Sequence, residues 1–219
     1  SGDWSSDVCS SDLIGIRINS GYQRAQFQET VRYIAQQYPI LKCVYKEEDG
    51  QPYGLITDDA VPSVEILQTG YGLSHENLVR QMKKDFKQPF NLEDGPLTKV
   101  IVYERVSGEA YVLFNIHHLI FDGSSAIIFL EAFFNAYRDI LQGQQPAGSS
   151  HTTDFGDYVQ WEEAFLQRED AAESLEYWKE NLSGELPVTA FPADNPTQGT
   201  KEFQGTTKEF LIDRELEQS

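Results

Sequence analysis

The chain of 219 residues has few cysteines, few basic residues and no long hydrophobic run. Cys9 and Cys43 are its only cysteines, and Cys9 lies in an N-terminal segment that we expect to be foreign to the fold. An internal disulfide is then excluded, which fits a reducing cytoplasm.

The 17 Lys and Arg residues are outnumbered by 35 Asp and Glu residues. The net charge of -18 disfavours nucleic acid or an anionic membrane as a partner, because both would be repelled. No apolar run approaches the ~20 residues of a membrane span, so we expect a soluble, cytoplasmic protein.

The first 13 residues differ from the rest of the chain. The segment DWSSDVCSSDL, Asp3 to Leu13, resembles the translation of a common short-read sequencing adapter. It has neither the basic start nor the apolar core of a signal peptide. We therefore expect residues 1–13 to be a sequencing-adapter artefact and disordered, and residues 14–219 to be the folded part. A natural Ser/Asp-rich tail is the alternative.

The segment HHLIFDG, His117 to Gly123, places two imidazoles, a carboxylate and a glycine between a strand and a helix. Residues 109–116 form a β-branched and aromatic run that predicts a mostly buried strand. If the strand ran through both histidines, their side chains would point in opposite directions, which disfavours a shared metal ion. Asp122 and Gly123 predict a turn, after which Ser124 or Ser125 would cap a helix over 126–141.

Periodicity and turn signals predict alternating strands and helices along the rest of the chain, without internal repeats. The predicted strands are 14–19, 41–46, 54–56, 63–67, 99–105, 109–116 and 201–212, and the predicted helices are 23–38, 74–86, 126–141, 155–167 and 171–182. Asp49-Gly50 and Ser107-Gly108 predict hairpin turns. Trp161, Tyr177 and Trp178 are expected to pack in a core rather than to form a binding platform. This pattern is typical of an α/β domain.

Residue chemistry alone leaves the HHLIFDG segment open to two interpretations. It is a candidate site, or it consists of ordinary strand-end histidines and a turn-forming aspartate. The segment resembles the HHxxxDG signature of condensation domains in nonribosomal peptide synthetases, within the superfamily of chloramphenicol acetyltransferase and other HxxxD acyltransferases. Further segments resemble other landmarks of that family in the family's order, and they cover roughly residues 14–219: YPILKCVY (38–45), PFNLEDGPL (89–97), DYVQW (157–161) and YWKENL (177–182).

The resemblance implies a fold, a reaction and partners. The fold would be α/β, a chloramphenicol-acetyltransferase-like two-layer sandwich, and residues 14–219 would be the N-terminal lobe of a two-lobe condensation domain, truncated at both ends. The implied reaction forms an amide between an acyl or peptidyl thioester and an aminoacyl thioester. Both substrates would ride on the phosphopantetheine arms of carrier proteins, so the lobe would bind no cofactor of its own. The expected partners are carrier domains and the missing C-terminal lobe, and the isolated lobe is expected to be folded but inactive.

The resemblance also assigns roles to residues. His118 matches the family's catalytic histidine, which acts as a general base or positions the amine, and His117 matches the first, mainly structural histidine. Asp122 matches the aspartate that holds the loop through an ion pair. Its usual arginine partner is Lys42 here, which keeps the charge and loses the two-pronged geometry. The backbone amide of Gly123 would approach the developing oxyanion.

Other functions stay open at this point. His117 argues against a heterocyclisation domain, which has aspartate there, and Ser124-Ser125-Ala126 argues against an epimerisation domain, which commonly continues with a Val-Ser-Trp-like segment. A free-standing acyltransferase that uses coenzyme A would match only HxxxD. From a different class, a non-catalytic carrier-docking or scaffold lobe is the competing hypothesis, motivated by Lys42 and the absent lobe. The basic residues Arg80, Lys83, Lys84 and Lys87 are a possible docking cluster, with a solvated helix face as the preferred interpretation.

Overall fold

A computed structural model describes residues 11–70, 74–86, 88–148 and 153–187. The chain divides into two compact units, Ser1–Arg168 and Glu169–Ser219. Among the described residues, the first unit contains β1 (Ser11–Ile18), α1 (Arg24–Gln37), η2 (Pro39–Lys42), β2 (Cys43–Glu48), β3 (Gln51–Ile56), η3 (Asp58–Ala60), β4 (Val64–Thr69), α2 (His75–Phe86), β5 (Thr98–Arg105), β6 (Ala110–His117), α3 (Gly123–Leu141) and α4 (Phe155–Leu166). The second unit contains α5 (Glu169–Asn181). No described helix is both long and apolar enough to cross a membrane.

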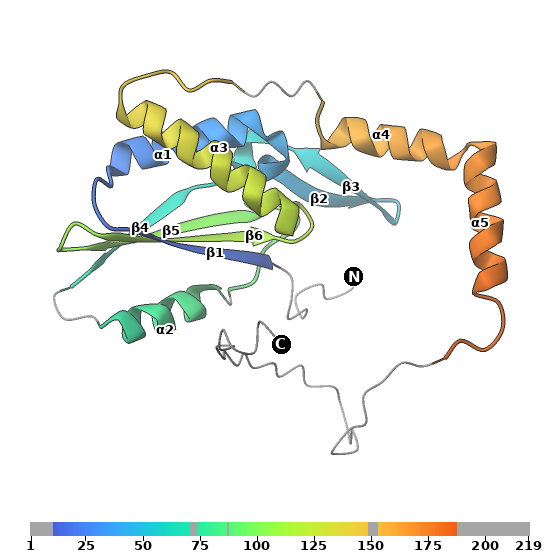
Figure 1. The fold of residues 1–219 in the computed structure, drawn as a ribbon, viewed down its shortest axis with the longest axis horizontal. Coiled ribbons are helices and arrows are strands. Elements are labelled where there is room, and N and C mark those ends of the chain that lie inside the picture. Colours follow the sequence, from blue (N-terminus) through green and yellow to red (C-terminus); the bar gives the residue numbers. More distant parts are fainter. Residues whose placement is uncertain (1–10, 71–73, 87, 149–152, 188–219) are drawn as a thin grey trace, which may run out of the picture. The chain divides into compact units, whose positions relative to one another are not determined.

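The main sheet has the strand order β1-β6-β5-β4. Strand β6 runs antiparallel to both β1 and β5, whereas β4 runs parallel to β5. Helices α1 and α3 lie over one face of this sheet, and α2 lies on the other (Figure 1). Strands β2 and β3 form a separate antiparallel hairpin. The candidate loop therefore leaves the end of a central strand that is covered on both faces.

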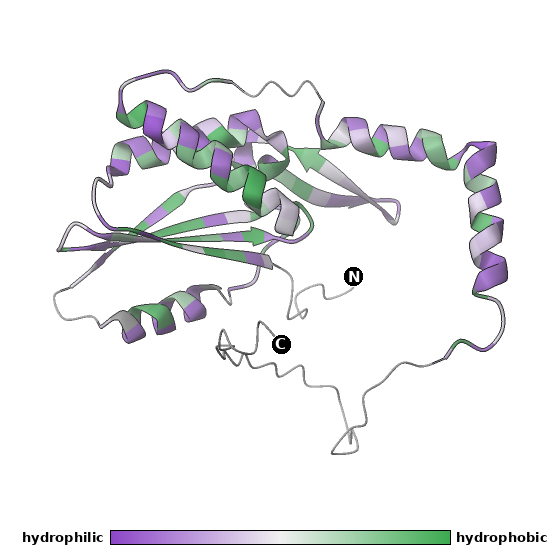
Figure 2. Ribbon diagram, in the orientation of Figure 1, coloured by the Kyte–Doolittle hydropathy of each residue, from purple (hydrophilic) through white to green (hydrophobic). Residues whose placement is uncertain are grey.

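Strands β5 and β6 are apolar on both faces, as the continuous hydrophobic runs predict (Figure 2). Alternate residues point to opposite sides of the sheet. One set, which includes Val112, Phe114 and Ile116, packs with the residues of α1 and α3. The other set, which includes Tyr111 and Leu113, packs against Leu78 of α2. The predicted 99–105 and 109–116 hairpin is confirmed.

Helix α1 buries the apolar stripe that the sequence predicts for 23–38. Phe27, Val31 and Ile34 are all buried. The Phe27 ring lies 5.2 Å from that of Phe133 on α3 and 6.3 Å from that of Phe114 on β6, measured between centroids. Aromatic packing thus connects both helices to the strand that carries the candidate loop.

The β2–β3 hairpin turns at Asp49 and Gly50, as predicted. Both residues have positive φ angles, 52° and 79°, which is the backbone that a two-residue hairpin turn requires. The predicted start of the strand at residue 41 is wrong. Leu41 and Lys42 belong to the short helix η2, which begins at Pro39 directly after α1 ends, and the strand begins at Cys43.

The expectation that residues 1–13 are disordered is wrong for the last three of them. β1 begins at Ser11, and its register pairs Ser11 with His117 and Leu13 with Asn115. Backbone pairing with β6 accommodates this polar sequence because strand pairing uses peptide groups common to all residues. Residues 1–10 lie outside the described residues, and so does the predicted strand over 201–212.

The two C-terminal described helices expose the aromatic residues that the sequence analysis expects in a core. Trp161 on α4 is 58% exposed, and Tyr177 and Trp178 on α5 are equally exposed. The α4 rings stack on one another instead, with Trp161 and Phe165 centroids 5.6 Å apart. The expected core packing of these three aromatic residues is therefore absent from the described residues.

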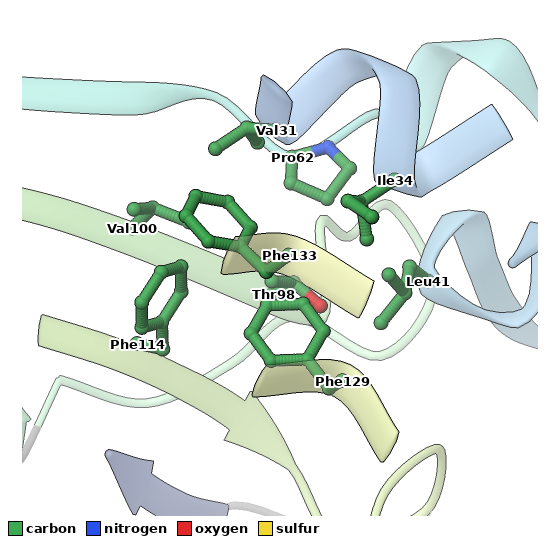
Figure 3. A pocket seen from close by; sticks show the side chains of 9 residues that line it. All are labelled: Val31, Ile34, Leu41, Pro62, Thr98, Val100, Phe114, Phe129 and Phe133. Carbon is green, nitrogen blue, oxygen red and sulfur yellow. The ribbon is translucent and has the colours of Figure 1, made fainter. Parts of the chain in front are cut away.

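A small void of about 10 Å³ lies within the core between the sheet and the helices (Figure 3). Its lining residues are apolar except for Thr98: Val31, Ile34, Leu41, Pro62, Val100, Phe114, Phe129 and Phe133. Thr98 is 2% exposed, and its hydroxyl oxygen has no hydrogen-bond partner among the described residues. A buried hydroxyl without a partner costs free energy.

Replacement of Thr98 by valine should therefore raise the free energy of unfolding by about 1 kcal/mol, since the shape is kept and the unpaired hydroxyl is removed. The midpoint of urea denaturation measures this change. Thr69→Val is the matched control, because the Thr69 hydroxyl donates to the Glu104 carbonyl at 2.9 Å and its loss should destabilise the fold. A lower midpoint for Thr98→Val would show that the hydroxyl is satisfied.

Candidate active site

The candidate loop begins where β6 ends, at His117. The His117 amide donates to the Leu97 carbonyl at 2.8 Å, and its own carbonyl accepts from the Ile120 amide at 3.1 Å. Its Nδ1 accepts from the Leu119 amide at 3.1 Å. The residues just after the strand are therefore folded back onto His117, which places the His118 side chain at a fixed turn.

His117 is a partly buried, structural residue in this arrangement. Its ring meets the Phe90 ring edge-on, with centroids 5.4 Å apart. Burial lowers the pKa of His117, and the neighbouring charge of His118 lowers it further. An unprotonated Nδ1 is what the hydrogen bond from Leu119 requires. The His117 ring thus accepts a hydrogen bond from the loop, and its lowered pKa favours the neutral form that this bond requires.

His118 has the opposite environment, with a side chain that is 57% exposed. Its Nδ1 lies 2.6 Å from Oδ2 of Asp12 on the neighbouring strand β1. The hydrogen bond to Asp12 raises the pKa of His118, the charge of Asp12 adds to this, and the charge of Asp122 contributes less. Nε2 makes no hydrogen bond within the part of the chain that the structure describes. A ring held at Nδ1 by a carboxylate with Nε2 open has the arrangement of a general base.

Sequence reasoning missed Asp12 because it assigns this residue to the adapter-like segment. Strand pairing is the only signal that could have revealed it, since β1 runs antiparallel to β6 and places Asp12 opposite Ile116. The contact between Asp12 and His118 is present in the chain with this sequence. Asp12 is therefore the largest cause of the raised pKa of the exposed histidine.

The Asp12→Asn variant should lower the pKa of His118 toward its ordinary value of 6.5, because the anionic partner is lost. Because the folded pKa of His118 is raised, the stability that it contributes is present below 6.5 and is lost as the pH rises through the folded value. Imidazole NMR titration measures the pKa of His118 directly. Asp59→Asn removes the same charge at an exposed site and should leave this pKa unchanged. An equal pKa in the Asp12 variant would mean that the carboxylate does not contact the ring.

Asp122 caps helix α3. Its carboxylate accepts from the Ser125 amide and from the Ser125 hydroxyl, both at 2.7 Å. These hydrogen bonds lower the pKa of Asp122. The predicted cap at Ser124 or Ser125 is therefore wrong, because the Asp122 side chain satisfies the first-turn amide from the N-cap position.

The expected ion pair between Lys42 and Asp122 is absent from the described structure. Lys42 Nζ instead lies 2.7 Å from Oδ1 of Asp58. Its side chain is 15% exposed, whereas that of Asp58 is 90% exposed. Because Lys42 lies in η2 and Asp58 in η3, the two short helices are connected to each other rather than to the loop.

Gly123 is the first residue of α3. Its φ is not positive, so other residues could adopt this backbone. A side-chain Cβ at this position would meet no atom within 4 Å among the described residues.

Three further predictions concern a metal site, the cysteine and the basic residues of α2. The described residues contain no group of three or more His, Cys, Asp or Glu side chains arranged to hold a metal ion. Cys43 is free and buried. On α2, Arg80 pairs with Glu76 at 3.2 Å, Lys83 and Lys84 lie on an exposed face, and Lys87 falls outside the described residues.

Comparison with known proteins identifies the family to which this site belongs. A family model described as the condensation domain matches residues 13–219. The chain belongs to the condensation domain family. The condensation domain family that the HHLIFDG segment indicates is thereby confirmed.

The chain is similar to short stretches of much longer proteins. It is 34% identical over 197 residues to the polyketide synthase PksN of Bacillus subtilis (strain 168), which is 87% of this chain and 3% of that protein. It is 26% identical over 201 residues to bacitracin synthase 3 of Bacillus licheniformis, which is 92% of this chain and 3% of that protein.

Solved structures confirm the fold. The epimerization domain from the third module of tyrocidine synthetase B superposes with a TM-score of 0.76 at 23% identity, over 86% of this chain and 43% of that chain. The starter condensation domain of rhizomide synthetase gives a TM-score of 0.73 at 17% identity, over 80% of this chain and 42% of that one. The fold is one lobe of the chloramphenicol-acetyltransferase-like sandwich, and the chain spans less than half of these domains.

Proposed function

We propose that this chain supplies the His118-bearing lobe of a domain that forms amide bonds in nonribosomal peptide synthesis. The donor would be an acyl or peptidyl thioester and the acceptor an aminoacyl thioester, each on the phosphopantetheine arm of a carrier protein. The similarity to proteins named as a polyketide synthase and as a bacitracin synthase supports a role in a synthase of this kind.

The environment of His118 carries this proposal. Its ring is exposed at the end of a rigid central strand, with Nδ1 held by Asp12 and with Nε2 open. The adjacent His117 is partly buried and kept neutral, so the two histidines have separate tasks. Environments that push two neighbouring pKa values apart are a feature of acid–base sites.

The proposed chemistry needs a group that handles one proton. The acceptor amine attacks the donor carbonyl, and the C–N bond forms while the carbonyl oxygen becomes an oxyanion. The resulting ammonium loses a proton, the C–S bond breaks, and the donor arm leaves as a thiol with that proton. Unprotonated Nε2 of His118 can accept the proton, or it can accept a hydrogen bond that orients the amine; both tasks require the neutral ring.

Other residues of the loop would support this step. Asp122 fixes the start of α3 through its bonds to the amide and hydroxyl of Ser125, and the amide of Gly123 is the first-turn group that would approach the oxyanion. Amides at a helix N-terminus stabilise negative charge, and the oxyanion of the tetrahedral intermediate is such a charge. Lys42 would hold η2 against η3 rather than hold the loop.

The experiment compares this chain with the full-length domain in which it is continued through a second lobe. Each protein receives one carrier loaded with an acyl group and one loaded with an amino acid, and intact-mass spectrometry detects the amide. We expect product from the full-length domain and none from the chain alone, because the thioester arms would meet between two lobes.

Two results would contradict parts of this proposal. Amide formed by the chain alone would remove the requirement for a second lobe. No amide from the unmutated full-length domain, under conditions in which both carriers stay loaded and bound, would favour the non-catalytic carrier-docking lobe. The Lys42–Asp58 pair makes this second function worth separating, since the loop lacks the ion pair that the family resemblance implies.

A further inference from the structure

The candidate loop has a connection to β2 that does not involve an ion pair. The Tyr45 hydroxyl donates to the Leu119 carbonyl at 3.1 Å, across 74 positions of sequence. Leu119 follows His118 directly, and its amide donates to His117 Nδ1. The peptide groups of Leu119 are therefore held on both sides, by the His117 ring and by the Tyr45 phenol.

Tyr45 is itself held firmly. Its amide donates to the Leu92 carbonyl at 2.8 Å, and strand pairing places it opposite Gly54. A Cβ at Gly54 would lie 3.8 Å from Cε1 of Tyr45, which is ordinary van der Waals contact, so the Tyr45 ring packs against this strand position. Burial raises the pKa of Tyr45, so its hydroxyl stays protonated and able to donate.

Tyr45 also occupies an informative position in the sequence. It ends the segment YPILKCVY (38–45), which resembles a landmark of the condensation domain family. The same segment supplies Lys42, which pairs with Asp58 and not with Asp122. One segment thus lacks the ion pair to the loop and gains a hydrogen bond to it.

We propose that Tyr45 is a positioning residue, whose hydroxyl fixes the peptide after His118 and thereby the direction of the His118 ring. This role rests on the proposed function of His118, although the tether itself can be measured without any catalysis. A neutral hydrogen bond is enough to bias the loop by a measurable factor.

The test is the Tyr45→Phe variant of this chain, which removes one oxygen and keeps the ring. Amide hydrogen exchange at Leu119 and Ile120 should accelerate about threefold to tenfold, the factor expected for one neutral hydrogen bond. Exchange at Val112, in the middle of β6, should change less. Tyr53→Phe is the matched control, since Tyr53 is an exposed tyrosine on the neighbouring strand β3.

Unchanged exchange at both loop amides would overturn the tether, and so would an equal acceleration throughout β6, which would indicate global destabilisation. The same variant in the full-length domain should lower kcat for amide formation and leave KM for the loaded carriers unchanged. Faster amide hydrogen exchange in the loop together with an unchanged kcat would contradict the positioning role. If the full-length domain forms no amide either with Tyr45 or with phenylalanine in its place, the proposed function fails. The exchange result still decides whether Tyr45 holds the loop.

Discussion

Replacement of His118 by alanine in the full-length domain should lower the single-turnover rate constant for amide formation by about 10²- to 10⁴-fold, the range that a positioned acid–base group supplies. The rate constant falls because alanine has no group that can accept the proton or hydrogen bond that Nε2 of His118 would accept. Quenched-flow mixing with preloaded carriers and mass detection of the amide gives the rate constant. Because His118 is exposed and outside the core, the variant should fold normally.

Leu119→Ala is the control for this variant. Leu119 is the next residue and is 49% exposed, and the substitution keeps the backbone groups that hold the loop. Its rate constant should stay close to that of the unmutated domain. If His118→Ala formed amide at the rate of this control, the loop would hold the chain in shape without acting on the substrates.

The Phe114→Ala variant should lower the free energy of unfolding of this chain by about 3–5 kcal/mol. Phe114 is 1% exposed at the centre of β6. Its ring lies 5.2 Å from those of Phe129 and Phe133, so truncation leaves a cavity that helix α3 can only partly fill. A loss of this size is a large share of the stability of an ordinary domain.

Urea denaturation followed by far-UV circular dichroism measures the Phe114 effect. Phe155→Ala is the matched control, because Phe155 on α4 undergoes the same truncation and is 51% exposed. Its effect should be smaller by several-fold. Equal midpoints for the two variants would mean that β6 and α3 do not pack as described.

The elements around the candidate loop could be predicted because their signals are local. The continuous apolar runs of β5 and β6 and the helical period of α3 each lie within a short stretch of chain. The strand order, in contrast, has no local signal in the sequence. Nothing in the sequence of β4 shows that it lies parallel to β5 while β1 pairs with β6, since these pairings depend on the whole core.

Side-chain partners at the site are harder to predict than the motif. Lys42 pairs with Asp58 because η2 and η3 lie together, and neither short helix has a periodic signal. Asp122 and Ser125 both carry good capping side chains, so composition could not choose between them. Asp12 lies in a segment whose resemblance to an adapter argues against any part in the fold. The segment nevertheless pairs with β6, because strand pairing depends on backbone groups and not on where the sequence comes from.

The exposed aromatic residues show the limit of a prediction based on residue type. Trp161 and Trp178 are large and apolar, which favours burial. Whether they are buried depends on what lies against them, and among the described residues both side chains stay more than half exposed. Their exposure is consistent with a chain that spans less than half of the solved domains that it resembles.

The most direct test of the central claim is a single turnover of the full-length domain with one acyl-loaded and one aminoacyl-loaded carrier, in which the mass of each carrier is followed. The account predicts that the donor carrier loses the acyl group and shows a free thiol. The acceptor carrier gains the mass of the same acyl group. Hydroxylamine, which cleaves thioesters, then releases the N-acyl amino acid as a hydroxamate whose amide bond is intact. Donor thioester lost only to water, with no gain on the acceptor, would contradict it.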